Sequence, residues 1–114
     1  MEIDNIRWSV AVPAANSKKL EEMFQTLITH VKSNPQRFPQ LRSAVICSSA
    51  GSESSEEDWM WMEEYANREA YEAFYKALDE DKTFLEIHDE KYDFWHLIVK
   101  DSFKSELYTE RARF

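Results

Sequence analysis

Four stretches of the chain have patterns that predict β-strands: in three of them successive side chains sort onto two distinct faces, and the other is a mostly apolar, partly β-branched run. The four predicted strands cover residues 6–12, 41–48, 59–65 and 105–114. In the stretch 59–65, tryptophans occupy one face and methionines the other. Because both faces carry large apolar groups, this strand is predicted to be central in a sheet and covered on both sides.

Between these strands the apolar residues recur every three or four positions, which predicts helices with one buried side. The first helix covers residues 20–31, after a cap at Asn16 or Ser17. The second follows the capping residue Asn67 and continues to residue 78, and a third covers residues 83–99. One helix is therefore predicted after the first strand, and two helices are predicted between the third strand and the last.

The order strand, helix, strand, strand, helix, helix, strand predicts an α+β fold of the ferredoxin-like βαββαβ type, with an extra helix before the last strand. In this fold the helices cover one face of an antiparallel sheet. The other face would be open, and Trp8 or Trp61 could lie on it, depending on the register. An apolar open face needs a cover, so we expect two chains to pack face to face as a homodimeric barrel.

Size and composition restrict the classes of function. The 114 residues suffice for one domain, residues 1–114, and the net charge of −8 argues against nucleic acid and anionic membrane surfaces as partners. The chain has no apolar run of about 18 residues and no signal-peptide pattern, which predicts a cytoplasmic protein. The single glycine, Gly51, excludes a glycine-rich phosphate loop. The single Cys47 excludes an intrachain disulfide, and we expect a buried, inert thiol rather than a nucleophile.

Aromatic residues make up 14% of the chain, which suggests either a core of large side chains or a ligand cavity. The candidates for a cavity wall are Trp8, Trp59, Trp61, Tyr65 and Tyr108.

Glu63 shares the predicted face of Trp59, Trp61 and Tyr65. Burial would raise the pKa of its carboxyl group and make it a candidate base. Alternatively, it forms an ion pair with an arginine of a neighbouring strand. The arginines available are Arg7, Arg42, Arg111 and Arg113.

The three histidines differ in their surroundings. His88 could act as a base near neutral pH, or it could be a partly exposed residue among acidic neighbours. His96 lies in an apolar stretch and is expected to be structural, whereas His30 is expected to face solvent. His88 and His96 are eight residues apart, too far for a metal pair one helical turn apart, so no metal site is predicted.

The junction between the third strand and the following helix resembles the dimeric α+β barrel superfamily, in particular the antibiotic-biosynthesis-monooxygenase-like families. Their signature is a strand ending Glu-x-Trp, followed by a helix with Ala five residues after the Trp. Glu63-Glu64-Tyr65 and Ala70 stand at these places. Phe74 stands where many such domains have His.

This resemblance implies a homodimeric, cofactor-independent monooxygenase that oxidises a small aromatic molecule in the barrel cavity. Glu63 or His88 would be the base, and Phe74 would join the aromatic wall. A non-catalytic dimer that binds a ligand or a protein is the alternative. Haem-degrading oxygenases of the superfamily use Phe-x-x-x-His with the His on iron, which Phe84 and His88 match, so haem is an alternative cofactor. Trp8 and Phe74 stand where those enzymes have Asn and Trp.

Overall fold

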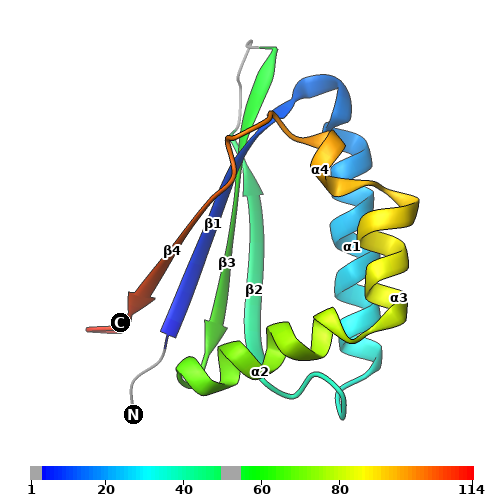
Figure 1. Ribbon diagram of the computed structural model, residues 1–114. Coiled ribbons are helices and arrows are strands. Elements are labelled where there is room, and N and C mark those ends of the chain that lie inside the picture. Colours follow the sequence, from blue (N-terminus) through cyan, green and yellow to red (C-terminus); the bar gives the residue numbers. More distant parts are fainter. Residues whose placement is uncertain (1–3, 50–54) are drawn as a thin grey trace.

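The computed structural model describes residues 4–49 and 55–114, in which four antiparallel strands form one sheet in the order β2–β3–β1–β4. These strands are β1 (Asp4–Pro13), β2 (Leu41–Ser48), β3 (Glu56–Tyr65) and β4 (Lys104–Thr109). The helices all lie on one side of the sheet (Figure 1). The predicted ferredoxin-like α+β fold is confirmed, and β3 is central as expected.

The helices begin and end where local chemistry favours it. They are the 3-10 turn η1 (Ala14–Asn16), α1 (Ser17–Ser33), α2 (Arg68–Asp79), α3 (Lys82–Leu85), the π-helix η2 (Glu86–Lys91) and α4 (Phe94–Leu97). The side chain of Asn67 accepts a hydrogen bond of 2.8 Å from the Ala70 N–H, which confirms it as the cap of α2. None of the described helices has the length and apolar character that crossing a membrane requires.

The prediction of one helix over residues 83–99 is wrong, because this stretch contains three short helical segments. Asp93 has a φ of 52°, a left-handed conformation that aspartate tolerates and that separates η2 from α4. After α4 the backbone becomes extended at Ile98, and the Val99 N–H donates to the Ala11 carbonyl at 2.8 Å. The apolar run therefore returns to the sheet instead of continuing a helix.

Two strand boundaries differ from the prediction by three residues or more. β3 begins at Glu56, three residues early, because it pairs with β1 as far as Pro13. β4 ends at Thr109, since its pairing with β1 ends at Asp4, and residues 110–114 continue outside the sheet. Residues 50–54, which follow β2 in the sequence, lie outside the described part of the chain.

The register decides which side chains face the helices. Trp8 lies opposite Trp61, and both pack with the core between the sheet and the helices, so neither lies on the open face. The open face instead presents Val45 and Met62, which are 57% and 41% exposed. Cys47 lies beside them and is exposed, so the prediction of a buried thiol is wrong.

Candidate functional site

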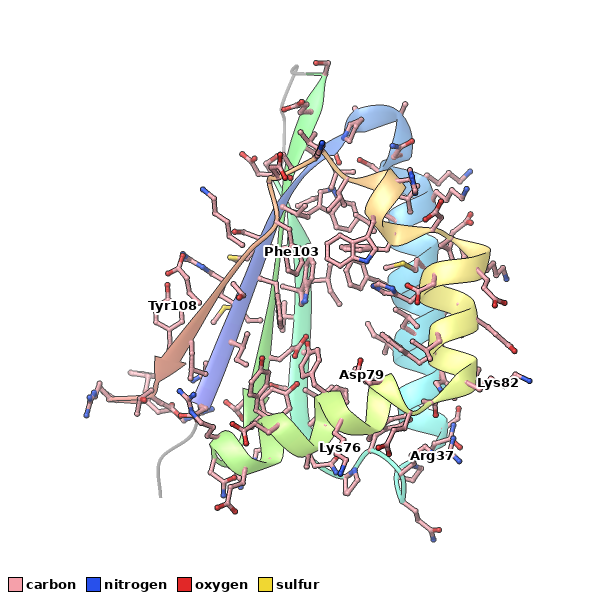
Figure 2. The ribbon with its side chains drawn as sticks, in the orientation of Figure 1. Arg37, Lys76, Asp79, Lys82, Phe103 and Tyr108 are labelled. Atoms are coloured by element: carbon pink, nitrogen blue, oxygen red, sulfur yellow. The ribbon has the colours of Figure 1, made fainter. Side chains whose placement is uncertain are left out.

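A cavity of about 700 Å³ lies between the sheet and the helices of a single chain. Figure 2 shows the side chains that converge on this space, including Phe103. β1, β2 and β3 supply its sheet side, and α1, α2, α3, η2 and α4 supply its helix side. The predicted aromatic cavity is therefore on the helix side of the sheet, not on the open side where two chains would meet, because the register turns the tryptophans inward.

Most of the predicted site residues meet at this cavity, and three do not. Those in its wall are Trp8, Trp61, Glu63, Phe74 and His88.

Trp59 and Tyr65 are buried on the same face of β3 but lie outside the cavity wall. Tyr108 lies on the opposite face and is exposed, because β4 pairs Leu107 with Ile6 and so turns Tyr108 to the open side. The expectation that Tyr108 joins the same aromatic wall is wrong.

Glu63 lies at the inner wall of the cavity and is held by two phenol groups. Its Oε1 accepts a hydrogen bond of 2.6 Å from Tyr65, and its two oxygens accept from Tyr75 at 2.7 and 2.9 Å. Within the described residues it has no ion pair with an arginine, lysine or histidine. Two of the candidate arginines pair elsewhere: Arg7 with Glu106, and Arg113 with Glu64 and Glu110.

The electrostatics of this group are set mainly by burial. Burial raises the pKa of Glu63, and the hydroxyls of Tyr65 and Tyr75, with the nearby indole groups of Trp8 and Trp61, oppose the rise only in part. Burial and the nearby carboxylate also raise the pKa of both tyrosines. The hydroxyls therefore keep their protons at neutral pH and continue to donate to Glu63.

A Glu63→Gln variant should show how much the buried charge lowers the free energy of unfolding. Because the pKa of Glu63 is higher in the folded protein than its ordinary 4.5, the unfolded chain loses this proton first as pH rises. Wild-type stability should therefore fall relative to the variant from about pH 4.5 upward, and the difference should level off above the folded pKa. Urea unfolding of both proteins across this pH range measures the difference. A constant difference at all pH values would show that folding leaves the titration of Glu63 unchanged.

Tyr75 is a site residue that sequence reasoning missed, because it looked like part of the apolar stripe of α2. A tyrosine on a buried stripe needs a partner for its hydroxyl, which is the signal that was available. Its ring packs 5.6 Å from that of Trp8, centroid to centroid. The indole N–H of Trp8 is itself buried and has no hydrogen-bond partner among the described residues. Buried donors without a partner are rare in folded proteins. The Trp8 N–H is therefore available to donate a hydrogen bond to a ligand in the cavity.

His88 comes from η2 and forms another part of the wall. Its Nδ1 lies 2.7 Å from Oδ1 of Asp89, and its ring lies between Phe84 and Phe94, at centroid distances of 5.2 and 4.8 Å. Only 20% of its side chain is exposed. A carboxylate on one imidazole nitrogen fixes the orientation and the tautomer of the ring, which leaves Nε2 to exchange a proton.

The other two histidines lie away from the cavity wall. His96 is exposed, and its Nδ1 lies 2.7 Å from a carboxylate oxygen of Asp93, a partner that a structural histidine is expected to have. His30 does not simply face solvent: its Nε2 lies 2.9 Å from Oδ1 of the buried Asp81. Asp81 also accepts hydrogen bonds of 2.7 Å from Arg37 and from the Phe84 N–H, so it ties α1 to the start of α3.

Comparison with known proteins shows similarity in structure but not in sequence. No protein-family model matches the chain, and no curated protein matches it. A dimeric ferredoxin-like protein from an uncultured marine organism superimposes with a TM-score of 0.66 and 14% identity, over 100% of this chain and 92% of that one.

Two further structures carry descriptions of activity. A candidate antibiotic biosynthesis monooxygenase from Bacillus cereus gives a TM-score of 0.63 at 12% identity, covering 100% of this chain and 98% of that one. A variant of SnoaB, a cofactor-independent oxygenase from Streptomyces nogalater, gives 0.58 at 14% identity, covering 98% and 95%. The chain thus has the ferredoxin-like α+β fold of these proteins and resembles the antibiotic-biosynthesis-monooxygenase-like structures among them.

Proposed function

We propose that the protein is a homodimeric enzyme that oxidises a small aromatic molecule with dioxygen, without a cofactor, in the cavity between sheet and helices. The observation that carries this proposal is the open aromatic cavity whose wall includes the ionisable side chains of Glu63 and His88. A cavity filled by its own side chains would have favoured a non-catalytic dimer. SnoaB, described as a cofactor-independent oxygenase, has the same fold, and this likeness serves as analogy.

The two groups suit different tasks. His88, oriented by Asp89, is placed to take a proton from the substrate, since a neutral imidazole is an effective base near pH 7. The resulting electron-rich anion can reduce dioxygen directly. Glu63, held by two tyrosines, is placed to bind a polar group of the substrate and fix its orientation.

Oxygen uptake tests the proposal directly. Chelator-treated protein, mixed with a panel of hydroxynaphthalenes and hydroxyanthracenes, should consume dioxygen at a rate that saturates with at least one compound. Binding of these compounds without oxygen uptake would favour the non-catalytic ligand-binding dimer.

Haem is the alternative ligand of the same cavity. His88 would hold the iron through Nε2, since Nδ1 is engaged by Asp89. The wall of this cavity nevertheless presents Trp8 and Phe74 where the haem-degrading enzymes have Asn and Trp. We therefore retain the function without cofactor.

The homodimer is proposed from the open face of the sheet. Val45, Met62 and Tyr108 are exposed there, and an apolar face of this kind is normally covered. Two chains that pair through this face would bury it symmetrically. The ion pair between Arg7 and Glu106 lies on the same face, with Arg7 beside Met62 and over the ring of Tyr108, so the interface would contain charged as well as apolar groups.

A Met62→Lys variant should convert the dimer to monomer at micromolar concentration, because it places a charge at the centre of the contact. Met62 lies between Arg7 of β1 and Val45 of β2. Sedimentation velocity measures the change. The matched control is Leu85→Lys, which replaces a comparably exposed apolar residue on the helix side and should leave the dimer intact. A wild-type protein that sediments as a monomer would contradict the dimer.

A further inference from the structure

The hydrogen bonds around Glu63 are arranged for a charged carboxylate. Both neighbouring hydroxyls, of Tyr65 and Tyr75, donate to it. Hydrogen bonds donated to a carboxylate stabilise its charged form. The two phenol groups therefore favour an anion at this position.

No cation is paired with this anion in the part of the chain that the structure describes. Buried charges in proteins are normally paired, because an isolated one is costly to remove from water. A carboxylate has room for about four hydrogen bonds, and two hydroxyl protons reach Glu63. The cationic residues of the cavity wall, Lys32 and Arg42, are both exposed, so they do not supply the charge at the buried inner end.

Aromatic rings surround the same carboxylate. The ring of Trp8 lies 6.2 Å from that of Trp61 and 5.6 Å from that of Tyr75, centroid to centroid, and all three belong to the cavity wall. Ring faces attract cations, and organic ammonium groups are commonly bound by several such rings beside a carboxylate. The net charge of −8 also favours the approach of a cation.

We propose that the ligand carries a protonated aliphatic amine on its aromatic body, and that this ammonium group binds beside Glu63 against the rings of Trp8, Trp61 and Tyr75. This inference rests on the proposed function, which places an aromatic ligand in the cavity, and adds the chemistry of its polar end. The amine would donate to the remaining acceptor positions of Glu63 and neutralise its buried charge. The aromatic body would then extend toward His88, at the η2 part of the wall.

Three ligands of similar shape test whether the charge of the ligand determines its affinity for the cavity. Tryptamine, tryptophol and indolepropionate share an indole ring and a two-carbon side chain that ends in an ammonium, a hydroxyl or a carboxylate group. In calorimetric titrations of the wild-type protein, tryptamine should bind about tenfold more tightly than tryptophol, and indolepropionate more weakly than either.

Two variants locate the effect. Glu63→Gln keeps an acceptor for both tyrosines but removes the charge, and it should reduce the advantage of tryptamine to about twofold or less. Glu64→Gln is the matched control, because Glu64 is the next residue of β3, faces the opposite side and pairs with Arg113. It should preserve the tenfold preference.

The outcomes separate this inference from the proposed function. Equal binding of tryptamine and tryptophol to the wild type, or an unchanged preference in Glu63→Gln, would overturn the amine while leaving the aromatic cavity in place. Failure of all three compounds to bind would overturn the amine and also count against an aromatic ligand. Oxygen uptake with uncharged hydroxyaromatics would support the oxidation independently of the amine.

Discussion

Replacing Asp81 with alanine should lower the free energy of unfolding by about 3 kcal/mol. Asp81 is buried and accepts hydrogen bonds from the Arg37 side chain and the Phe84 N–H. Its Oδ1 also lies 2.9 Å from Nε2 of His30. Removing it breaks a buried charge cluster, which costs about 3–5 kcal/mol in other proteins, and the cap of α3, which is worth about 1 kcal/mol. The lower end of this range applies because Arg37 is partly exposed and can return to water.

Urea unfolding measures this loss of stability. Two further variants separate the contribution of the charge from that of the cap and compare both with a surface ion pair. Asp81→Asn keeps an oxygen for the Phe84 N–H but loses the charge, so it should cost about half as much. Glu86→Ala removes an exposed ion pair with Lys82, 3.9 Å long, and should cost no more than about 0.5 kcal/mol. Equal losses in Asp81→Ala and Glu86→Ala would show that the cluster contributes no more than a surface pair.

The same cluster should make stability fall in acid. Burial alone would raise the pKa of Asp81, but hydrogen bonds from Phe84, Arg37 and His30 lower it below its ordinary 3.8. The unfolded chain therefore takes up this proton at a higher pH than the folded protein does. The contribution of Asp81 is complete above about pH 3.8 and is lost as the pH falls below it, a loss that Asp81→Asn should not show.

A His88→Gln variant should lower the rate of substrate-dependent oxygen uptake by about 100-fold, because glutamine cannot accept the proton. Binding of the substrate should change far less, so the loss should appear in kcat rather than in KM. Asp89→Asn should give a smaller loss, since it removes the orientation of the imidazole but not the base.

The chain offers a matched control for this experiment. His96 also lies 2.7 Å from a carboxylate, that of Asp93, but it is exposed and outside the cavity wall. His96→Gln should therefore leave oxygen uptake unchanged, and a similar loss in both variants would remove His88 as the base. Haem titration of the wild type should give no Soret shift that depends on His88; a shift abolished by His88→Ala would favour the haem alternative.

The sequence predicted the order of elements well, because each strand and the first two helices carry a clear apolar period. It also predicted that Glu63 lies on a buried aromatic face. Two parts of the site depend on contacts that the pattern does not encode. Tyr75 reaches Glu63 only because α2 packs across β3, and Tyr108 leaves the aromatic wall because of a register that is fixed by pairing with β1.

The region of His88 was the least predictable, because its apolar pattern is continuous while its backbone is not. A single φ of 52° at Asp93 and a return to the sheet at Val99 divide the stretch. Neither leaves a mark on the apolar period. Long-range backbone pairing decides the structure here, and local preference does not.

The π-helix η2 makes the geometry of the cavity depend on residue count as well as on side-chain chemistry. The Tyr92 N–H donates to the Ile87 carbonyl five residues earlier, at 3.1 Å, so this turn holds one residue more than an α-helical turn. Loss of one residue would change by about 100° the direction in which the chain leaves η2 toward α4. His88 would then no longer meet Phe94 across the turn. In evolutionary terms, a one-codon deletion within η2 could dismantle this wall without changing the type of any residue in it.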